Sequence, residues 1–105
     1  MLFYQCFFGI TYTFEKKTEM QISVELTLSP LQDDFKAPIE KFIKVLRRSG
    51  FKVIENPLST QVYGEYDKIM EFLTEEIKEA FASSEHVLLT MKIVKSNLSD
   101  YAADF

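Results

Sequence analysis

Three neutral hydrogen-bonding side chains stand in a row at Ser59, Thr60 and Gln61, within a stretch that alternates as a strand does. Hydroxyl and amide groups suit a small polar ligand better than a dry core, because a ligand without matching groups leaves them unpaired. Tyr63 could add a flat surface for an aromatic ring. The residues alone leave two interpretations open: a small-molecule site, or hydroxyls that satisfy backbone groups beside the turn at 56–57.

Charged side chains near this cluster allow a second kind of chemistry. Glu25 and Lys92 are expected on adjacent strands with their side chains on the same face of a sheet. They could orient an amine and an anionic group of a ligand, or they could form a cross-strand ion pair with no further role. Glu25 and Glu65 could act as paired carboxylates in acid–base catalysis, although nothing in the sequence brings them together.

Composition excludes several classes of function. The chain has 105 residues, enough for one domain, with 16 acidic against 12 basic residues. This acidic balance argues against a nucleic-acid partner, since phosphate binding depends on clustered Lys and Arg. One cysteine, Cys6, permits neither an internal disulfide nor a cysteine zinc site, and is consistent with a cytoplasmic location. With His86 as the only histidine, we expect no catalytic residue, no metal site and no cofactor.

The first nineteen residues differ from the rest. They hold six of the fifteen aromatic residues, are too short to span a bilayer and lack the basic region of a secretory signal. They could form an extra strand, an apolar arm that binds a partner, or an extension upstream of a natural start at Met20, where a clean strand begins. We therefore expect an extension over 1–19, a domain over 20–96 and a tail over 97–105.

Periodicity predicts the elements of that domain. Strands are expected at 21–29, 51–55, 58–65 and 86–94. One helix should start near Ala37 and end before Gly50, and a second should follow Asp67 as its N-cap. The order predicts an α+β, ferredoxin-like βαββαβ sandwich, in which two helices cover one face of a four-stranded antiparallel sheet. The apolar sides of the first and last strands should face the helices, which leaves a polar sheet face open to a ligand or a subunit.

Three segments resemble the YkoF-like family of proteins that bind thiamine or hydroxymethylpyrimidine. They read "MQISVELTLSPL", "APIEKFIKVLRRSGFKVIENPLSTQVYGEYDKIMEFL" and "HVLLTMKI", and the resemblance covers roughly residues 20–96. Its most specific part is "PLSTQVYGEYDKIM". The aromatic-rich extension has no counterpart in the family, and the family's C-terminal helix is absent or truncated here.

The resemblance implies a ferredoxin-like domain that forms homodimers or homotetramers. It implies binding of thiamine or hydroxymethylpyrimidine without catalysis, in thiamine salvage, transport or homeostasis. The ligand-binding residues that it implies are Ser59, Thr60, Gln61, Tyr63, Gly64, Glu65 and Ser29. We add Glu25 as a further carboxylate that could bind the ligand.

Two other functions compete with this one. The open sheet face could serve an oligomeric interaction module that binds no small molecule. Alternatively, the chain could be a small enzyme acting on a pyrimidine or thiamine derivative, with Glu25 or Glu65 as general base. The lack of an activated nucleophile or histidine makes the enzyme the weakest of the three.

Overall fold

The structure, a computed structural model, describes residues 19–105. The predictions for residues 1–18 lie outside this range. The elements along the chain are β1 (Gln21–Pro30), α1 (Lys36–Arg47), β2 (Lys52–Glu55), β3 (Thr60–Glu65), α2 (Tyr66–Ala82) and β4 (Val87–Val94).

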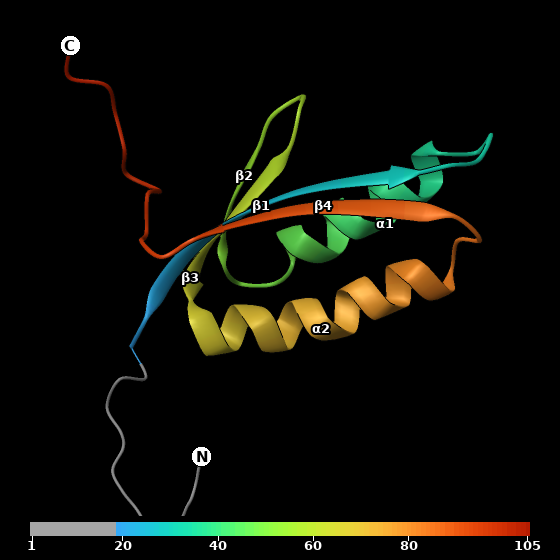
Figure 1. Cartoon of the computed structure of the whole chain (residues 1–105), viewed down its shortest axis with the longest axis horizontal. Coiled ribbons are helices and arrows are strands. Elements are labelled where there is room, and N and C mark those ends of the chain that lie inside the picture. The colour runs from blue at the N-terminus through green and yellow to red at the C-terminus, as the bar shows by residue number, and fades with distance from the viewer. Residues whose placement is uncertain (1–18) are drawn as a thin grey trace, which may run out of the picture.

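The four strands form one antiparallel sheet in the order β2-β3-β1-β4. Both helices pack on the same side of this sheet, and in Figure 1 α2 runs below β4 while α1 passes behind β1 and β4. The first and last strands of the domain are therefore neighbours, although they are far apart in sequence. The predicted ferredoxin-like βαββαβ sandwich is confirmed.

The core lies between the sheet and the helices. The alternation of β1 turns Ile22, Val24 and Leu26 toward the helices, where all three are buried. The rest of the core consists of Leu28 at the far end of β1 and the buried apolar side chains of the other elements, namely Phe42, Leu46, Val62, Ile69 and Leu73. The opposite, polar side of β1 then forms the middle of an uncovered sheet face.

Strand β3 starts two residues later than predicted, at Thr60 rather than Leu58. The cause is Asn56, whose side-chain Oδ1 accepts hydrogen bonds from the backbone N–H of Leu58 at 3.2 Å and of Ser59 at 3.1 Å. These bonds hold residues 56–59 in a turn, because a side-chain acceptor replaces the partners that a strand would give those N–H groups.

The N-terminus of α2 also differs from the prediction. Glu65, not Asp67, is the N-cap, and its carboxylate accepts from the backbone N–H of Asp67 and Lys68, each at 3.2 Å. A carboxylate here also interacts favourably with the helix dipole. Glu65 thus joins the end of β3 to α2 without an intervening loop.

Strand β4 is less covered than its pattern suggests. Met91 and Ile93 point to the helix side, as expected, but they remain 37% and 44% exposed. The reason is position: β4 is an edge strand, and the helices pack mainly over β1 and β3.

Candidate functional site

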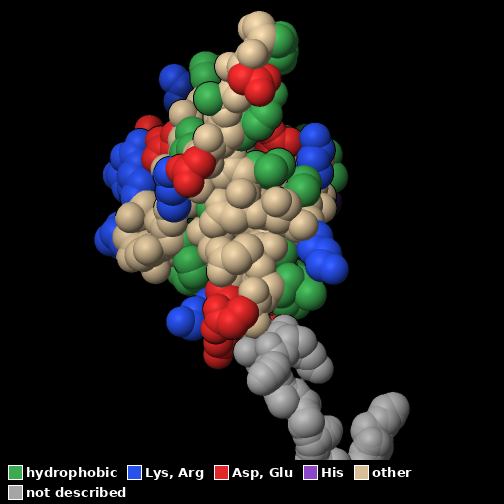
Figure 2. Space-filling view, turned by 90° about the vertical axis from the view of Figure 1, so that its left-hand side faces the viewer, with side chains coloured by type: hydrophobic (Ala, Val, Ile, Leu, Met, Phe, Trp, Pro, Cys, Tyr) green, Lys and Arg blue, Asp and Glu red, His purple; other side chains and the backbone are tan. Residues whose placement is uncertain are grey.

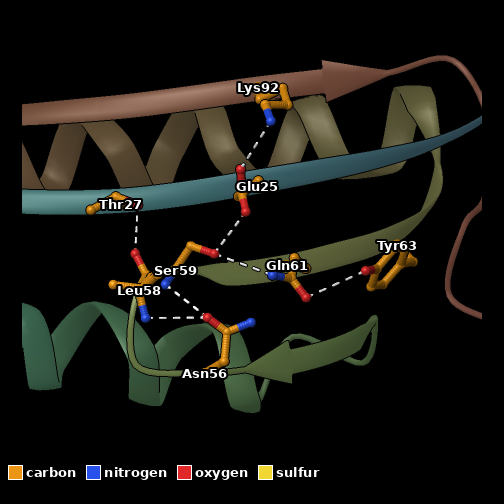
Figure 3. A network of polar contacts seen from close by, with 8 residues as sticks. All are labelled: Glu25, Thr27, Asn56, Leu58, Ser59, Gln61, Tyr63 and Lys92. Atoms are coloured by element: carbon orange, nitrogen blue, oxygen red, sulfur yellow. Dashed lines mark hydrogen bonds and ion pairs between the residues drawn. The ribbon is translucent and has the colours of Figure 1, made fainter.

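A chain of polar contacts crosses the open face of the sheet. Ser59 Oγ donates to Glu25 Oε2 at 2.8 Å and accepts from Gln61 Nε2 at 3.2 Å. On the other side of Glu25, Lys92 Nζ lies 3.6 Å from Oε1, as the predicted same-face placement requires. Tyr63 ends the chain with a long 3.5 Å contact from its hydroxyl to Gln61 Oε1. Figure 3 shows these side chains, which come from β4, β1, β3 and the turn before β3, in one continuous row.

The position of Ser59 depends on the turn before β3. Asn56 holds this turn from within, and Thr27 Oγ1 on β1 donates to the carbonyl of Leu58 at 3.2 Å (Figure 3). The hydroxyl of Ser59 therefore reaches a carboxylate on the neighbouring strand rather than a backbone group. Of the two sequence interpretations, backbone satisfaction does not describe Ser59.

The polar contacts also set the charge of Glu25. The hydrogen bond from Ser59 is the largest effect on the pKa of Glu25 and lowers it. Desolvation opposes this effect, and the positive charge of Lys92 lowers the pKa further. Its side chain is 40% exposed, so the carboxylate is ionised at neutral pH and reachable by a ligand.

A depression of about 230 Å³ lies over this face of the sheet. Glu25, Gln61 and Lys92 provide its polar part, and Tyr63, Val94 and Leu98 its apolar part. A volume of this size is on the small side for a ligand pocket and fits one or two small rings better than an extended molecule.

Four residues that line this depression were not predicted as site residues from the sequence: Ser23, Val24, Val94 and Leu98. Ser23 extends the polar row of β1, and Leu98 lies in the tail beyond β4. Leu98 belongs to a segment without periodicity, so only the fold, which returns this segment to β1, reveals it. The position of Ser23 could have been predicted, because it alternates with the core residues of β1 in the same way as Glu25.

A second depression, of about 200 Å³, lies on the helix side of the sheet. Thr60 lines it and is only 7% exposed, because it points away from the face that carries Gln61. Its other walls come from β1, α1 and the turn, including Leu28, Phe42 and Ser59. The hydroxyl–amide triplet is thus divided: Gln61 lines the open-face depression, whereas Ser59 and Thr60 line the helix-side one. Ser59 reaches the open face through its hydrogen bond to Glu25.

The remaining predicted site residues have other surroundings. A Cβ on Gly64 would lie 3.3 Å from Phe51 Cδ1 and 3.4 Å from Ile69 Cδ1, which indicates a role in packing on the helix side. Glu65 caps α2. Ser29 is on the open face but pairs with Leu88 at the far end of β1, away from Glu25. The structure brings Glu25, Ser59, Gln61 and Tyr63 together, as argued above.

We also searched residues 19–105 for patches of one charge, metal-ligand clusters and membrane-spanning helices. Acidic and basic side chains are interspersed on the face seen in Figure 2. Within residues 19–105, no group of three His, Cys, Asp or Glu side chains could hold a metal ion. No helix over the same residues has the length and apolar character needed to cross a membrane.

The fold and the mixed polar and apolar depression define a ferredoxin-like domain with a candidate ligand-binding face. Residues 24–99 match the family described as thiamine-binding protein, and the chain belongs to that family. The resemblance noted from the sequence is therefore confirmed. No curated protein sequence matches the chain significantly.

Solved structures support the same fold. A protein of Streptococcus pneumoniae is 30% identical, with a TM-score of 0.69, and the match covers 77% of this chain and 93% of that one. A Thermotoga maritima protein, proposed to act in thiamine biosynthesis or salvage, is 23% identical with a TM-score of 0.64, over 70% and 81% of the two chains. A domain of unknown function from Bacillus cereus is 17% identical with a TM-score of 0.63, over 86% and 89%.

Proposed function

We propose that this protein binds thiamine or its hydroxymethylpyrimidine moiety on the open face of the sheet, without converting it. The observation that supports this most directly is Glu25, an ionised and accessible carboxylate held by the neutral side chain of Ser59 beside an apolar wall. Family membership makes a thiamine-related ligand the natural candidate.

The polar and apolar parts of the depression match the hydrogen-bonding groups and the ring faces of the pyrimidine. The aminopyrimidine ring of the ligand is flat and carries an exocyclic amine, which would donate a hydrogen bond to the carboxylate of Glu25. The amide of Gln61 offers the ring both a donor and an acceptor. The ring faces would contact Tyr63 and Leu98, which line the apolar half. In thiamine, the cationic thiazolium would gain further from the negative charge of Glu25.

A binding role without catalysis agrees with the chemistry of these side chains. The ionisable groups that line the depression are Glu25, Lys92 and Tyr63, and the first two are already paired with each other. A general base in such a pair loses driving force for proton transfer, since its pKa is lowered rather than raised toward neutrality. We place the protein in thiamine salvage, transport or homeostasis, in the cytoplasm, where one cysteine and no disulfide are usual.

We also propose that the protein acts as a homodimer or homotetramer and does not bind nucleic acid. Edge strand β4 exposes Leu88, Met91 and Ile93, and an apolar edge of this kind is commonly covered by another chain. Val94 and Lys92 of the same strand line the depression, so a subunit placed there would border the ligand. The net charge of −4 opposes nucleic-acid binding. Sedimentation of the full chain, alone and with RNA, measures both.

Calorimetric titration of the full chain with thiamine, and separately with hydroxymethylpyrimidine, tests the proposal. We expect both to bind with a Kd of roughly micromolar order, since recognition lies in the pyrimidine that they have in common. Gln61→Ala should weaken both, and Thr60→Val, which keeps its shape but loses a hydroxyl on the other face, should weaken neither. Loss of binding in Thr60→Val alone would move the site to the helix-side depression. If the parent chain binds neither ligand, the proposed function is wrong.

A further inference from the structure

We propose that the segment at residues 96–100, which we call the crossing segment, forms one wall of the open-face depression. In this proposal the side chain of Leu98 determines the affinity of the protein for a planar heteroaromatic ring. The inference rests on the proposed function and deepens it. It assigns to the aperiodic tail a binding role that its sequence does not suggest.

The crossing segment is fixed to β1 by one hydroxyl group. Ser23 Oγ donates to the carbonyl of Ser96 at 2.6 Å and accepts from the backbone N–H of Leu98 at 2.9 Å. Ser23 is only 8% exposed, so these bonds are shielded from water and both hydrogen-bonding capacities of the hydroxyl are used. A single buried side chain therefore sets the backbone on both sides of Asn97.

Further contacts carry the segment across the end of the sheet. Asn97 Nδ2 donates to Gln21 Oε1 on β1 at 3.2 Å, and its own Oδ1 accepts from the N–H of Ser99 at 3.0 Å. Beyond this point, Asp100 lies 3.5 Å from Lys52 Nζ on β2. The chain leaves β4, passes β1 and reaches β2, so it closes one end of the open face.

Leu98 is the side chain that this path presents to the depression. It lines the depression together with Tyr63 and Val94, yet it stays 46% exposed, which leaves apolar surface for a ligand to cover. Burial of part of a leucine against a ring is favourable in proportion to the area removed from water. Glu25 lines the same depression, so a ligand gains from both residues only if it combines an apolar ring face with a hydrogen-bond donor.

Ser23 acts on this contact as a positioning residue. It holds the backbone of Leu98 and has both its hydrogen bonds committed to the crossing segment. Removal of its hydroxyl should therefore weaken binding through Leu98 rather than through a lost contact with the ligand. Such dependence has a signature, because two changes that act through one contact are not additive.

The test is titration of hydroxymethylpyrimidine into the parent chain and into Leu98→Ala, Leu98→Met, Ser23→Ala and the double variant Ser23→Ala/Leu98→Ala. The matched control is Leu31→Ala, which truncates an exposed leucine outside the depression. We expect Leu98→Ala to raise the Kd about fivefold. Leu98→Met should restore most of the affinity, Ser23→Ala should resemble Leu98→Ala, the double variant should be no weaker than either alone, and Leu31→Ala should bind as the parent does.

Each other outcome overturns a defined part of the proposal. Parent-like binding by Leu98→Ala, with the parent chain binding, refutes the wall while the proposed function stands. Multiplied effects in the double variant refute the positioning role of Ser23. No binding by the parent chain removes both the function and this inference. Since the Leu98 side chain is exposed, its variants should fold even if Ser23→Ala does not.

Discussion

Ser59 Oγ lies 2.8 Å from Glu25 Oε2, a contact that joins the turn before β3 to the middle of β1. In the register of these strands Glu25 faces Gln61, so Ser59 is its diagonal neighbour on the same face. A serine two residues before a strand partner can reach a carboxylate in this way only if the turn holds it close, which is the role of Asn56. The site is thus assembled by the turn as much as by the sheet.

Ser59→Ala should raise the pKa of Glu25 toward its ordinary value of 4.5. The hydrogen bond from Ser59 is the largest cause that lowers this pKa, and alanine cannot donate it. Carboxyl chemical shifts of Glu25 followed by NMR against pH measure the change. Ser83→Ala, at the distant end of α2, is the control and should leave the titration of Glu25 unaltered.

The free energy of unfolding should decrease as the pH falls below about 4.5, in part because of Glu25 and Glu55. Ser59 lowers the pKa of Glu25, and the paired hydrogen bonds from Arg47, at 2.6 and 2.8 Å, lower that of Glu55. A carboxylate with a lowered folded-state pKa stabilises the protein above the ordinary value of 4.5, and this stabilisation is lost as the pH falls through the folded-state pKa.

Urea unfolding between pH 3 and 7, as rough limits, measures this dependence. Glu55→Gln should flatten the acid limb, because glutamine does not titrate there. Glu85→Gln is the matched control. An acid limb that stays as steep in Glu55→Gln as in the parent would show that Glu55 does not contribute.

Lys92→Met should strengthen the binding of thiamine and change that of neutral hydroxymethylpyrimidine less. Lys92 Nζ lies 3.6 Å from the carboxylate of Glu25, which we propose binds the ligand. Lys92 therefore competes with the ligand for Glu25 and also repels a cationic ligand. We expect about a threefold decrease in the Kd of thiamine at low salt, diminishing as salt screens exposed charges. Lys68→Met, on α2, is the control. Weaker thiamine binding by Lys92→Met would place Lys92 among the groups that hold the ligand.

Gly64→Ala should destabilise the fold by about 1–3 kcal/mol, because the new methyl group meets Phe51 and Ile69 in a packed region. Gly50→Ala gives a comparison of a different kind. A Cβ there meets nothing within 4 Å, but the backbone φ of +90° is unfavourable for alanine, at a cost of about 1 kcal/mol. Thermal unfolding measures both. A ligand Kd that changes in Gly64→Ala while stability does not would return Gly64 to the binding site.

Asn56→Ala should lower the free energy of unfolding by about 1 kcal/mol and weaken ligand binding as well. The variant loses the acceptor for the N–H groups of Leu58 and Ser59, so the hydroxyl of Ser59 is no longer held toward Glu25. Asn56→Asp keeps the acceptor oxygen and should retain both properties. Equal losses in the two variants would mean that this acceptor is not what holds the turn.

The sequence predicts the fold well because the signals are local and periodic. The strict alternation of β1 places Glu25 on the open face, and cross-strand pairing then brings Lys92 beside it. The same alternation puts Ser59 and Gln61 opposite Thr60, so the triplet could be divided between two faces from its pattern alone. Ser59 and Thr60 nevertheless both line the helix-side depression, because Ser59 lies in the turn just before β3.

The sequence does not predict contacts between a side chain and a backbone segment that is distant along the chain. Ser23 binds a segment more than seventy residues away, and no periodicity marks that pairing. Glu65, rather than Asp67, is the N-cap of α2 because the helix begins at the residue that follows the end of β3. The sequence pattern does not show that the two elements are directly adjacent. The exposure of Met91 follows from the edge position of β4, which belongs to topology rather than to composition.

The pairing of β1 with β4 has a consequence for the order of events during synthesis. A nascent chain can form the β2–β3 hairpin and pack it early, but β1, one of the two inner strands, keeps one side unpaired until β4 has left the ribosome. The wall formed by Leu98 comes later still. The ligand therefore cannot guide the early steps of folding, and it can stabilise the domain only once nearly the whole of it has been translated.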